Sequence, residues 1–326
     1  MYAKSEVDQT LAFVLASGKG TRLGPITANC AKPAVSIFEN YRLIDFVLSN
    51  LVNSRVRWIY VLLQHQPDSL AKHIAEVWQL PLRRRGLSLE TVVRHCGSPH
   101  SAWKGTAHAV YENLHFIQRH RPRHVLVFAA DHVYRMDVGQ MLDFHCERAA
   151  DVTIAAVAMK LADASAFGVI EADSQGTIAR FSEKPAQPTP LPDDPETAMV
   201  SMGNYIFGEA VLKKALDSAA MKRGRVDFGH HVIPELCQQQ YRVVAYDFAL
   251  NRVPGLRSHE EPGYWRDVGT PMALSSVRGD VSGQFPRFEL VNSIWPLQPA
   301  RVAGAVETKP RFVRPATLAV GPVDLV

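Results

Sequence analysis

Short apolar runs alternate with segments of helical periodicity along the first half of the chain, and this alternation constrains the fold more than any other feature. Segment 41–54 has Ile44, Val47, Leu48 and Leu51 at the i, i+3, i+4, i+7 spacing of a buried helix face. The apolar runs contain few polar residues, so we expect strands buried on both faces of a sheet. Strands and helices in this order predict an α/β fold with a Rossmann-like, doubly wound sheet, mixed but mainly parallel. The expected strands are 11–16, 58–63, 124–130 and 151–158, and a second helix is expected at 106–118.

The pattern changes after about residue 160. Segment 167–185 predicts a β-hairpin with its turn at 173–176, and the run "SMGNYIF" predicts a further strand at 201–207. Prolines and glycines become frequent after residue 282, where helical periodicity ends. We therefore expect one large domain over 1–285, followed by a short irregular or β tail over 286–326.

Charge and cysteine content exclude several classes of protein. The net charge is only +4 and the longest basic cluster is Arg83–Arg85, so we expect no nucleic-acid partner. No apolar run approaches the roughly 20 residues that span a bilayer, so we expect no membrane partner. The cysteines form no CxxC pair, which indicates a reduced, cytoplasmic enzyme without a disulfide framework or zinc cluster. Nothing near the pair His145–Cys146 in the sequence completes a metal site.

A glycine-containing loop, "SGKGTR" at 17–22, directly follows the first expected strand. It is not a Walker loop, because Lys19 is followed by Gly20 rather than Ser or Thr. It fits a dinucleotide fingerprint poorly, because Leu23 stands at the third glycine position. The loop alone leaves two interpretations open, a phosphate-binding loop and a tight turn with incidental basic residues.

The wider segment "LASGKGTRLGPITANCAKPA" resembles the signature LAGGxGTRLxPLT…KP of sugar-1-phosphate nucleotidyltransferases. Further segments similar to that family follow in the family's order: "YRLIDFVLSNLVNSRV", "LLQHQPDSLAKHI", "WKGTAHAV", "AADHVYRMD", "ASAFGVI", "FSEKPAQP", "SMGNYIF", "DFGHHVIP" and "GYWRDVGT". They are most similar to the ADP-glucose pyrophosphorylase branch. The resemblance implies a nucleotide-diphospho-sugar transferase, GT-A-like fold. It also implies that an NTP and a sugar 1-phosphate condense to an NDP-sugar and pyrophosphate, most like ATP and glucose 1-phosphate giving ADP-glucose.

The resemblance also implies catalytic roles. Arg22 would grip the triphosphate, and Lys32 would bring a second positive charge to it. Asp131 and Asp267 would hold Mg²⁺, the expected cofactor, since carboxylate oxygens suit this cation. Lys184 would contact the sugar phosphate.

Two sets of binding residues follow from the same motifs. The nucleotide set is Ala16, Ser17, Gly18, Gly20, Thr21, Gln64, Trp103, Gly105 and Thr106. The sugar-phosphate set is Gly168, Glu183, Lys184, Ser201 and Gly203. Alternatives stay open: Trp103 could pack in the core instead of on a base, and Glu183 and Lys184 could form a surface ion pair.

The tail departs from the family pattern. Members of this branch carry a C-terminal left-handed β-helix domain that serves tetramer contacts and effector binding, and residues 286–326 would be a remnant of it. We therefore expect any homo-oligomer to be a dimer rather than the family's tetramer. Ala28, Asn29 and Cys30 stand where glycogen enzymes carry basic residues that meet anionic effectors, so effector binding is also in doubt.

The base-reading loop departs as well. Segment 94–103, "RHCGSPHSAW", replaces a Pro/Gln-rich segment, and Arg94 suits guanine acceptors better than the adenine edge that glutamine can pair with. Both ATP and GTP therefore remain candidate substrates. Ser17 and Ala130 replace family glycines with residues small enough for function.

Three hypotheses remain open at this point. The first is an unregulated enzyme that makes ADP-glucose. The second is a specialised relative that acts on a cyclitol phosphate such as valienol 1-phosphate, with ATP or GTP. The third is a regulatory subunit with little activity, which would be expected to lack Arg22, Asp131 or Lys184. All three residues are present.

Overall fold

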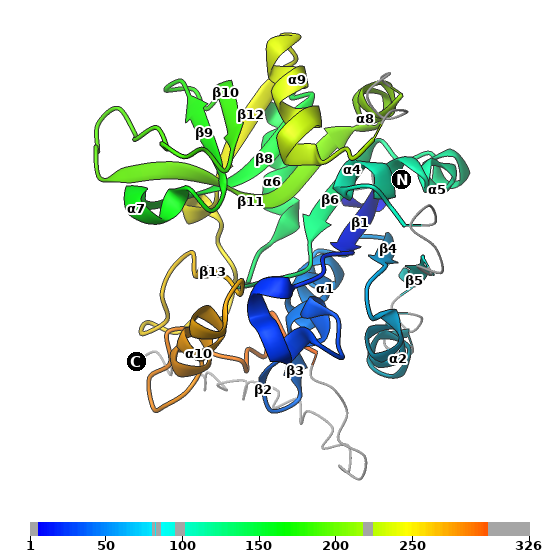
Figure 1. The fold of residues 1–326 in the computed structure, drawn as a ribbon, viewed down its shortest axis with the longest axis vertical. Coiled ribbons are helices and arrows are strands. Elements are labelled where there is room, and N and C mark those ends of the chain that lie inside the picture. Colours follow the sequence, from blue (N-terminus) through cyan, green and yellow to red (C-terminus); the bar gives the residue numbers. More distant parts are fainter. Residues whose placement is uncertain (1–5, 80–81, 83–85, 95–101, 218–223, 299–326) are drawn as a thin grey trace, which may run out of the picture.

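The central element of the protein is a mixed sheet (Figure 1). The computed structural model describes residues 6–79, 82, 86–94, 102–217 and 224–298, and within these residues the sheet has nine strands. Four neighbouring strands run parallel, so their carboxyl ends meet at one edge. In spatial order they are β6 (His124–Ala129), β1 (Thr10–Ala16), β4 (Trp58–Leu63) and β5 (Ser88–Val93). The predicted Rossmann-like α/β arrangement is confirmed.

The longest strand, β11 (Thr197–Gly208), joins the parallel strands to the rest of the sheet. It pairs antiparallel with β6, with β8 (Val152–Lys160) and with β9 (Gly168–Ala172). β9 and β10 (Ile178–Glu183) form the predicted hairpin, and β12 (Val243–Asp247) lies parallel to β8. The sheet is thus parallel on one side of β6 and mixed on the other.

Helices cover both faces of the sheet. Successive side chains of β1 point to opposite faces and are apolar, so both faces must be covered. Ala12 and Val14 point into one apolar cluster, whereas Leu11 and Phe13 point into another on the opposite face. The first cluster contains residues of α1 (Leu43–Asn53), α2 (Pro67–Val77) and α6 (Val138–Glu147). The second contains residues of α4 (Thr106–Tyr111), α5 (Leu114–His120), α8 (Glu209–Leu216) and α9 (Ile233–Gln238).

The prediction of one helix over 106–118 is wrong, because the segment forms two helices, α4 and α5. The break lies at Asn113, whose backbone N–H donates to the carbonyl of Val110. The Asn113 side chain donates to the carbonyl of Ala109 at 2.8 Å and so takes over the role of the helical backbone bond. A short polar side chain that competes for backbone groups interrupts a helix in this way.

A third apolar cluster includes residues of α10 (Pro271–Asp280), a helix that lies below the sheet in Figure 1. Here β13 (Trp265–Asp267) pairs antiparallel with β7 (His132–Tyr134). Phe288 and Leu297 of the expected tail are buried in this cluster. The remaining short elements are η1 (Glu6–Gln9), η2 (Thr21–Thr27), η3 (Lys32–Ala34), β2 (Ser36–Phe38), β3 (Tyr41–Arg42), α7 (Leu161–Ala164), η5 (Phe228–Val232) and η6 (Phe248–Leu250).

The rest of the expected tail, residues 299–326, and the basic cluster Arg83–Arg85 lie outside the described residues. No helix in the described part of the chain is long and apolar enough to cross a membrane.

A buried carboxylate ties the first two helices together. Asp45 of α1 is fully buried. Its Oδ1 accepts hydrogen bonds from His73 Nε2 at 2.7 Å and from Trp78 Nε1 at 2.8 Å. Its Oδ2 accepts the backbone N–H of Arg42 at 2.8 Å. Removal of the carboxylate would leave these donors without an acceptor inside the core.

We therefore expect Asp45→Ala to lower the free energy of unfolding by about 3–5 kcal/mol. Chemical denaturation followed by far-UV circular dichroism measures this change. Asp193→Ala, which removes an exposed carboxylate, is the matched control and should change stability by less than about 0.5 kcal/mol. A loss below about 1 kcal/mol for Asp45→Ala would contradict the structural role of this carboxylate.

Candidate active site

A cavity of about 1210 Å³ opens where β1 and β6 end. Its position agrees with the rule that ligands of open α/β sheets bind at the carboxyl ends of the strands. Its lining contains the cationic side chains of Lys19, Arg22, Lys32, Lys104, Lys184 and Arg225 and the carboxylates of Asp131, Glu183 and Asp227. Because positive charges outnumber negative ones, the cavity suits a polyanionic ligand.

The glycine loop forms one wall of the cavity, and its conformation requires glycine at position 20. Gly20 has a φ of 66°, and a Cβ at this position would lie 2.9 Å from Cβ of Lys32. The Thr27 hydroxyl donates to the carbonyl of Gly20 at 2.8 Å and closes the loop. The loop is therefore held against Lys32, with the backbone of Gly18 exposed toward the cavity.

Lys32 is the centre of a charge cluster at the base of this loop. Its Nζ lies 2.6 Å from Oδ2 of Asp131 and 3.2 Å from Oδ1 of Asp267. Asp131 follows β6, and Asp267 ends β13, so two strand ends bring the carboxylates together. The Lys32 side chain is only 9% exposed, and those of Asp131 and Asp267 are 33% and 17% exposed.

The charges in this cluster support one another. Burial would lower the pKa of Lys32, but the carboxylates of Asp131 and Asp267 outweigh it and raise the pKa. Burial would likewise raise the pKa of Asp131, but His132 and Lys32 lower it to about 2. Lys32 and Asp131 therefore form an ion pair throughout the neutral pH range.

The same carboxylates fit a hard divalent cation. Ligand atoms of Asp131, His132 and Asp267 all lie within 4.8 Å of one another. Carboxylate oxygens are the ligands that Mg²⁺ prefers, usually together with water and substrate phosphates. The Lys32 ammonium now contacts both carboxylates, so a cation bound there would compete with it.

Glu183, the last residue of β10, and Lys184, which follows it, also line the cavity. Lys184 Nζ lies 3.4 Å from Oε1 of Glu183, and its side chain is 54% exposed. Gly168 and Gly229 pack on the other carboxylate oxygen: added Cβ atoms would lie 3.0 and 2.2 Å from Oε2 of Glu183. Two glycines thus fix where this carboxylate sits, while Lys184 can reach into the cavity.

Gln64 and Trp103 contact each other. Gln64 Oε1 accepts the backbone N–H of Trp103 at 2.9 Å, and both residues are buried. The Trp103 ring belongs to the apolar cluster on one face of the sheet and also lines the cavity. Gln64 therefore positions the chain that leads into Gly105 and Thr106.

Asp227 is a cavity residue whose role the sequence did not reveal. Its Oδ1 accepts from the backbone N–H of Thr106 at 2.9 Å, and its Oδ2 accepts from Nε of Arg225 at 2.8 Å. The Thr106 hydroxyl in turn accepts the backbone N–H of Phe228 at 3.0 Å. Asp227 and Gly229 both belong to the motif "DFGHHVIP", but only the fold shows that this segment links Thr106 to Glu183.

Most of the predicted site residues line this one cavity. They are Ser17, Gly18, Gly20, Thr21, Arg22, Lys32, Gln64, Trp103, Gly105, Thr106, Asp131, Glu183, Lys184 and Gly203. Ala16 lies in the core instead. Gly168, Ser201 and Asp267 lie behind the lining, each in contact with a residue that belongs to it. The lining also contains residues absent from the prediction, among them Lys19, His65, Lys104, Arg225, Asp227, Gly229, His230 and Gly269.

The expected base-reading loop is described only at its ends, because residues 95–101 lie outside the described residues. At one end, Nη1 of Arg94 lies 3.4 Å from Oε2 of Glu112. The guanidinium of Arg94, which the sequence suggested as a contact for a guanine base, is thus engaged by Glu112.

Comparison with known proteins gives a consistent picture. The nucleotidyl transferase family matches residues 11–282. The chain is 47% identical to glucose-1-phosphate adenylyltransferase of Thermodesulfovibrio yellowstonii over an alignment of 296 residues. This alignment covers 91% of the chain and 72% of that protein. The chain is 41% identical over 305 residues to the enzyme of the same name from Thermus thermophilus, and this alignment covers 90% of the chain and 72% of that enzyme. A relative of that name from Mycolicibacterium smegmatis is 44% identical over 297 residues. The alignment covers 90% of the chain and 72% of the relative.

The cluster around Lys32 generates a prediction about cation binding. Lys32→Met leaves two carboxylates close together without their ammonium partner, so we expect a loss of about 2 kcal/mol in the free energy of unfolding without added metal. Added Mg²⁺ should restore more stability to this variant than to the unaltered protein, because the cation no longer competes with Lys32. Denaturation curves with and without MgCl₂ measure both effects. Lys72→Met, at an exposed lysine, is the control. Equal gains from Mg²⁺ in all three proteins would contradict competition at this site.

Proposed function

The chain belongs to the nucleotidyl transferase family, and from this premise we propose that it condenses ATP with glucose 1-phosphate to give ADP-glucose and pyrophosphate. The name of its relatives, glucose-1-phosphate adenylyltransferase, supports this substrate pair. The observation that carries the proposal is the meeting of the glycine loop, Lys32 and two carboxylates at one end of a cationic cavity. Such a site meets the needs of a reaction between two anions, which must be held together and neutralised.

The glycine loop would bind the triphosphate. Backbone N–H groups around Gly18 and Gly20 can approach phosphate oxygens closely because no Cβ intervenes. Arg22 and Lys19, both exposed at the cavity wall, would neutralise the pyrophosphate as it leaves. Gln64 and Trp103 would border the base, since they lie on the same side of the cavity as Gly105 and Thr106.

The sugar phosphate would bind on the opposite wall. Glu183 would accept hydrogen bonds from sugar hydroxyls, and its fixed position between Gly168 and Gly229 supports this role. Lys184 would hold the phosphate, whose oxygen attacks the α-phosphorus in line with the departing pyrophosphate. Gly203 lines the same wall, and Ser201 would support it by accepting the Gly203 N–H at 3.1 Å.

Asp131 and Asp267 would hold Mg²⁺. The bound cation would supply charge stabilisation to the phosphates. Lys32 would then be released from the carboxylates and turn its ammonium to the triphosphate. The proposed catalytic residues are thus Arg22, Lys32, Asp131 and Lys184.

We further propose that residues 1–285 form the catalytic domain, which the family match over 11–282 supports. The burial of Phe288 and Leu297 shows that the chain continues to pack against this domain beyond residue 285.

The assigned role of Asp131 predicts a large kinetic effect. Asp131→Asn keeps the size of the side chain but removes the charge that would bind the cation. We expect turnover to fall at least about a thousandfold, equivalent to about 4 kcal/mol of barrier. Continuous detection of pyrophosphate measures the rate, and Asp193→Asn is the control for loss of an exposed carboxylate. A loss smaller than about tenfold would show that Asp131 is not the cation ligand.

A substrate matrix tests the substrate pair. ATP, GTP, CTP, UTP and dTTP are each combined with several sugar 1-phosphates and with valienol 1-phosphate, with Mg²⁺ present and pyrophosphate measured. We expect the highest kcat/KM for ATP with glucose 1-phosphate. Turnover only with GTP, or only with the cyclitol phosphate, would replace this substrate pair while leaving the chemistry intact. Absence of turnover with every pair would favour a regulatory subunit.

A further inference from the structure

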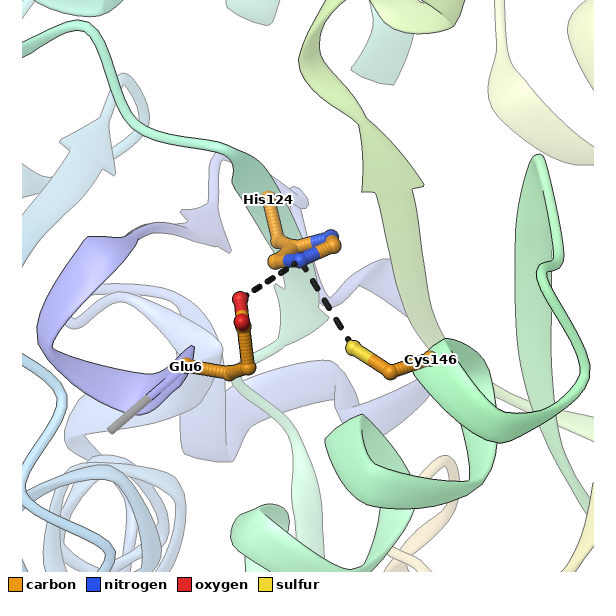
Figure 2. A group of neighbouring side chains, drawn as sticks. All are labelled: Glu6, His124 and Cys146. Carbon is orange, nitrogen blue, oxygen red and sulfur yellow. Dashed lines mark hydrogen bonds and ion pairs between the residues drawn. The ribbon is translucent and has the colours of Figure 1, made fainter. Parts of the chain in front are cut away.

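Glu6, His124 and Cys146 meet at the end of the sheet opposite the cavity (Figure 2). His124 is the first residue of β6, whereas Ala129, its last residue, lines the cavity. Glu6 begins η1, directly before β1, and Cys146 lies in the last turn of α6. The sequence did not predict this group, because Cys146 lies next to Glu6 and His124, which are distant along the chain, rather than forming a site with the adjacent His145.

The spacing of the three ligand atoms matches a tetrahedral metal site. His124 Nε2 lies 3.3 Å from Oε2 of Glu6 and 3.7 Å from Sγ of Cys146. All three atoms lie within 4.8 Å of one another. Bond lengths of about 2.0 Å to nitrogen or oxygen and about 2.3 Å to sulfur place tetrahedral ligand atoms about 3.3–3.6 Å apart. The observed separations of His124 Nε2 from both partners are close to this range.

Hydrogen bonds alone do not satisfy these atoms. Figure 2 shows the imidazole of His124 facing both Glu6 and Cys146 through the same nitrogen. Glu6 Oε2 is buried, and the contact given for it among the described residues is with His124 Nε2 at 3.3 Å. A single proton on Nε2 can serve only one neighbour. A cation between the three atoms would serve all of them.

The surroundings fix the ligands and supply negative charge. The second carboxylate oxygen of Glu6, Oε1, accepts from Nη1 of Arg123 at 3.2 Å, which leaves Oε2 turned toward His124. The His124 ring packs edge to face on His145, with centroids 5.1 Å apart. The carboxylates of Glu6, Asp143 and Glu147 act on Cys146 and outnumber the one positive charge given beside it, that of Arg123. This environment attracts a cation.

We propose that Glu6, His124 and Cys146 form a structural zinc site with water as the fourth ligand. A thiol and an imidazole select a transition metal such as Zn²⁺ over Mg²⁺ or Ca²⁺. Zn²⁺ binds the thiolate, and the thiol proton passes to solvent. The Glu6 side chain is 34% exposed, so water can reach the site. The metal would fasten the N-terminal segment to β6 and α6, at the end of the sheet remote from the phosphate-binding loop.

Cobalt substitution tests the site directly. The full chain, freed of metal by chelation, is titrated with Co²⁺, which shows a near-ultraviolet charge-transfer band only when a thiolate is bound. We expect this band at one equivalent of Co²⁺, its displacement by Zn²⁺, and a rise in melting temperature on addition of Zn²⁺. Cys146→Ser and His124→Gln should each abolish the band and weaken Zn²⁺ binding by about a hundredfold or more at this site.

Two controls separate this site from others that bind metal. Cys30→Ser removes a thiol elsewhere in the chain, and Asp131→Asn disables the carboxylate cluster at the cavity; both should keep the band. Mass spectrometry of the folded protein gives the zinc content independently. Absence of the band in the unaltered protein, its persistence in Cys146→Ser, or its loss in Cys30→Ser would each overturn the proposal. None of these outcomes depends on the enzyme's substrates, so they leave the proposed reaction untouched.

Discussion

The ion pairs of Lys32 with Asp131 and Asp267 are the interaction on which the architecture of the active site depends. They join residues 99 and 235 positions apart and so bind the segment after the glycine loop to two strand ends. Two carboxylates this close together in a largely buried site repel each other unless a positive charge lies between them. The ammonium of Lys32 supplies this positive charge. The loop depends on it as well, because Gly20 packs on the Lys32 side chain.

The central sheet has the cavity at one end of its parallel strands and the group of Glu6, His124 and Cys146 at the other end. At the carboxyl ends of β1 and β6, loops diverge and leave a cavity lined by cations. At the amino ends, Thr10 of β1 pairs with His124 of β6, and η1 and α6 close over them. Packing of alternate β1 residues into two apolar clusters keeps the strand between these ends rigid.

The sequence predicted the parts of the fold that depend on local pattern. The strand predicted at 58–63 is observed without change, because short runs of apolar residues have few alternatives inside an α/β sheet. The helix predicted at 106–118 was divided by one side-chain hydrogen bond from Asn113, which apolar periodicity does not register. Of the residues that the motifs predicted for the site, Lys32 and Glu183 line the cavity. Asp227 and Gly229 were not assigned, since their roles arise only from contacts across the fold.

The charge distribution around Lys32 is compatible with two roles, its ion pairs with Asp131 and Asp267 and its proposed contact with the triphosphate. The Lys32 ammonium contacts both carboxylates, and their charges raise its pKa, which keeps it charged. A triphosphate alone would have to draw Lys32 from two carboxylates and would leave those carboxylates facing its own negative charge. A divalent cation held by Asp131 and Asp267 would offset their negative charge, and Lys32 would then be free to neutralise the phosphates. In the proposed reaction, the energetic cost of moving Lys32 would therefore be met by the nucleotide and the cation together, and each would bind more weakly alone.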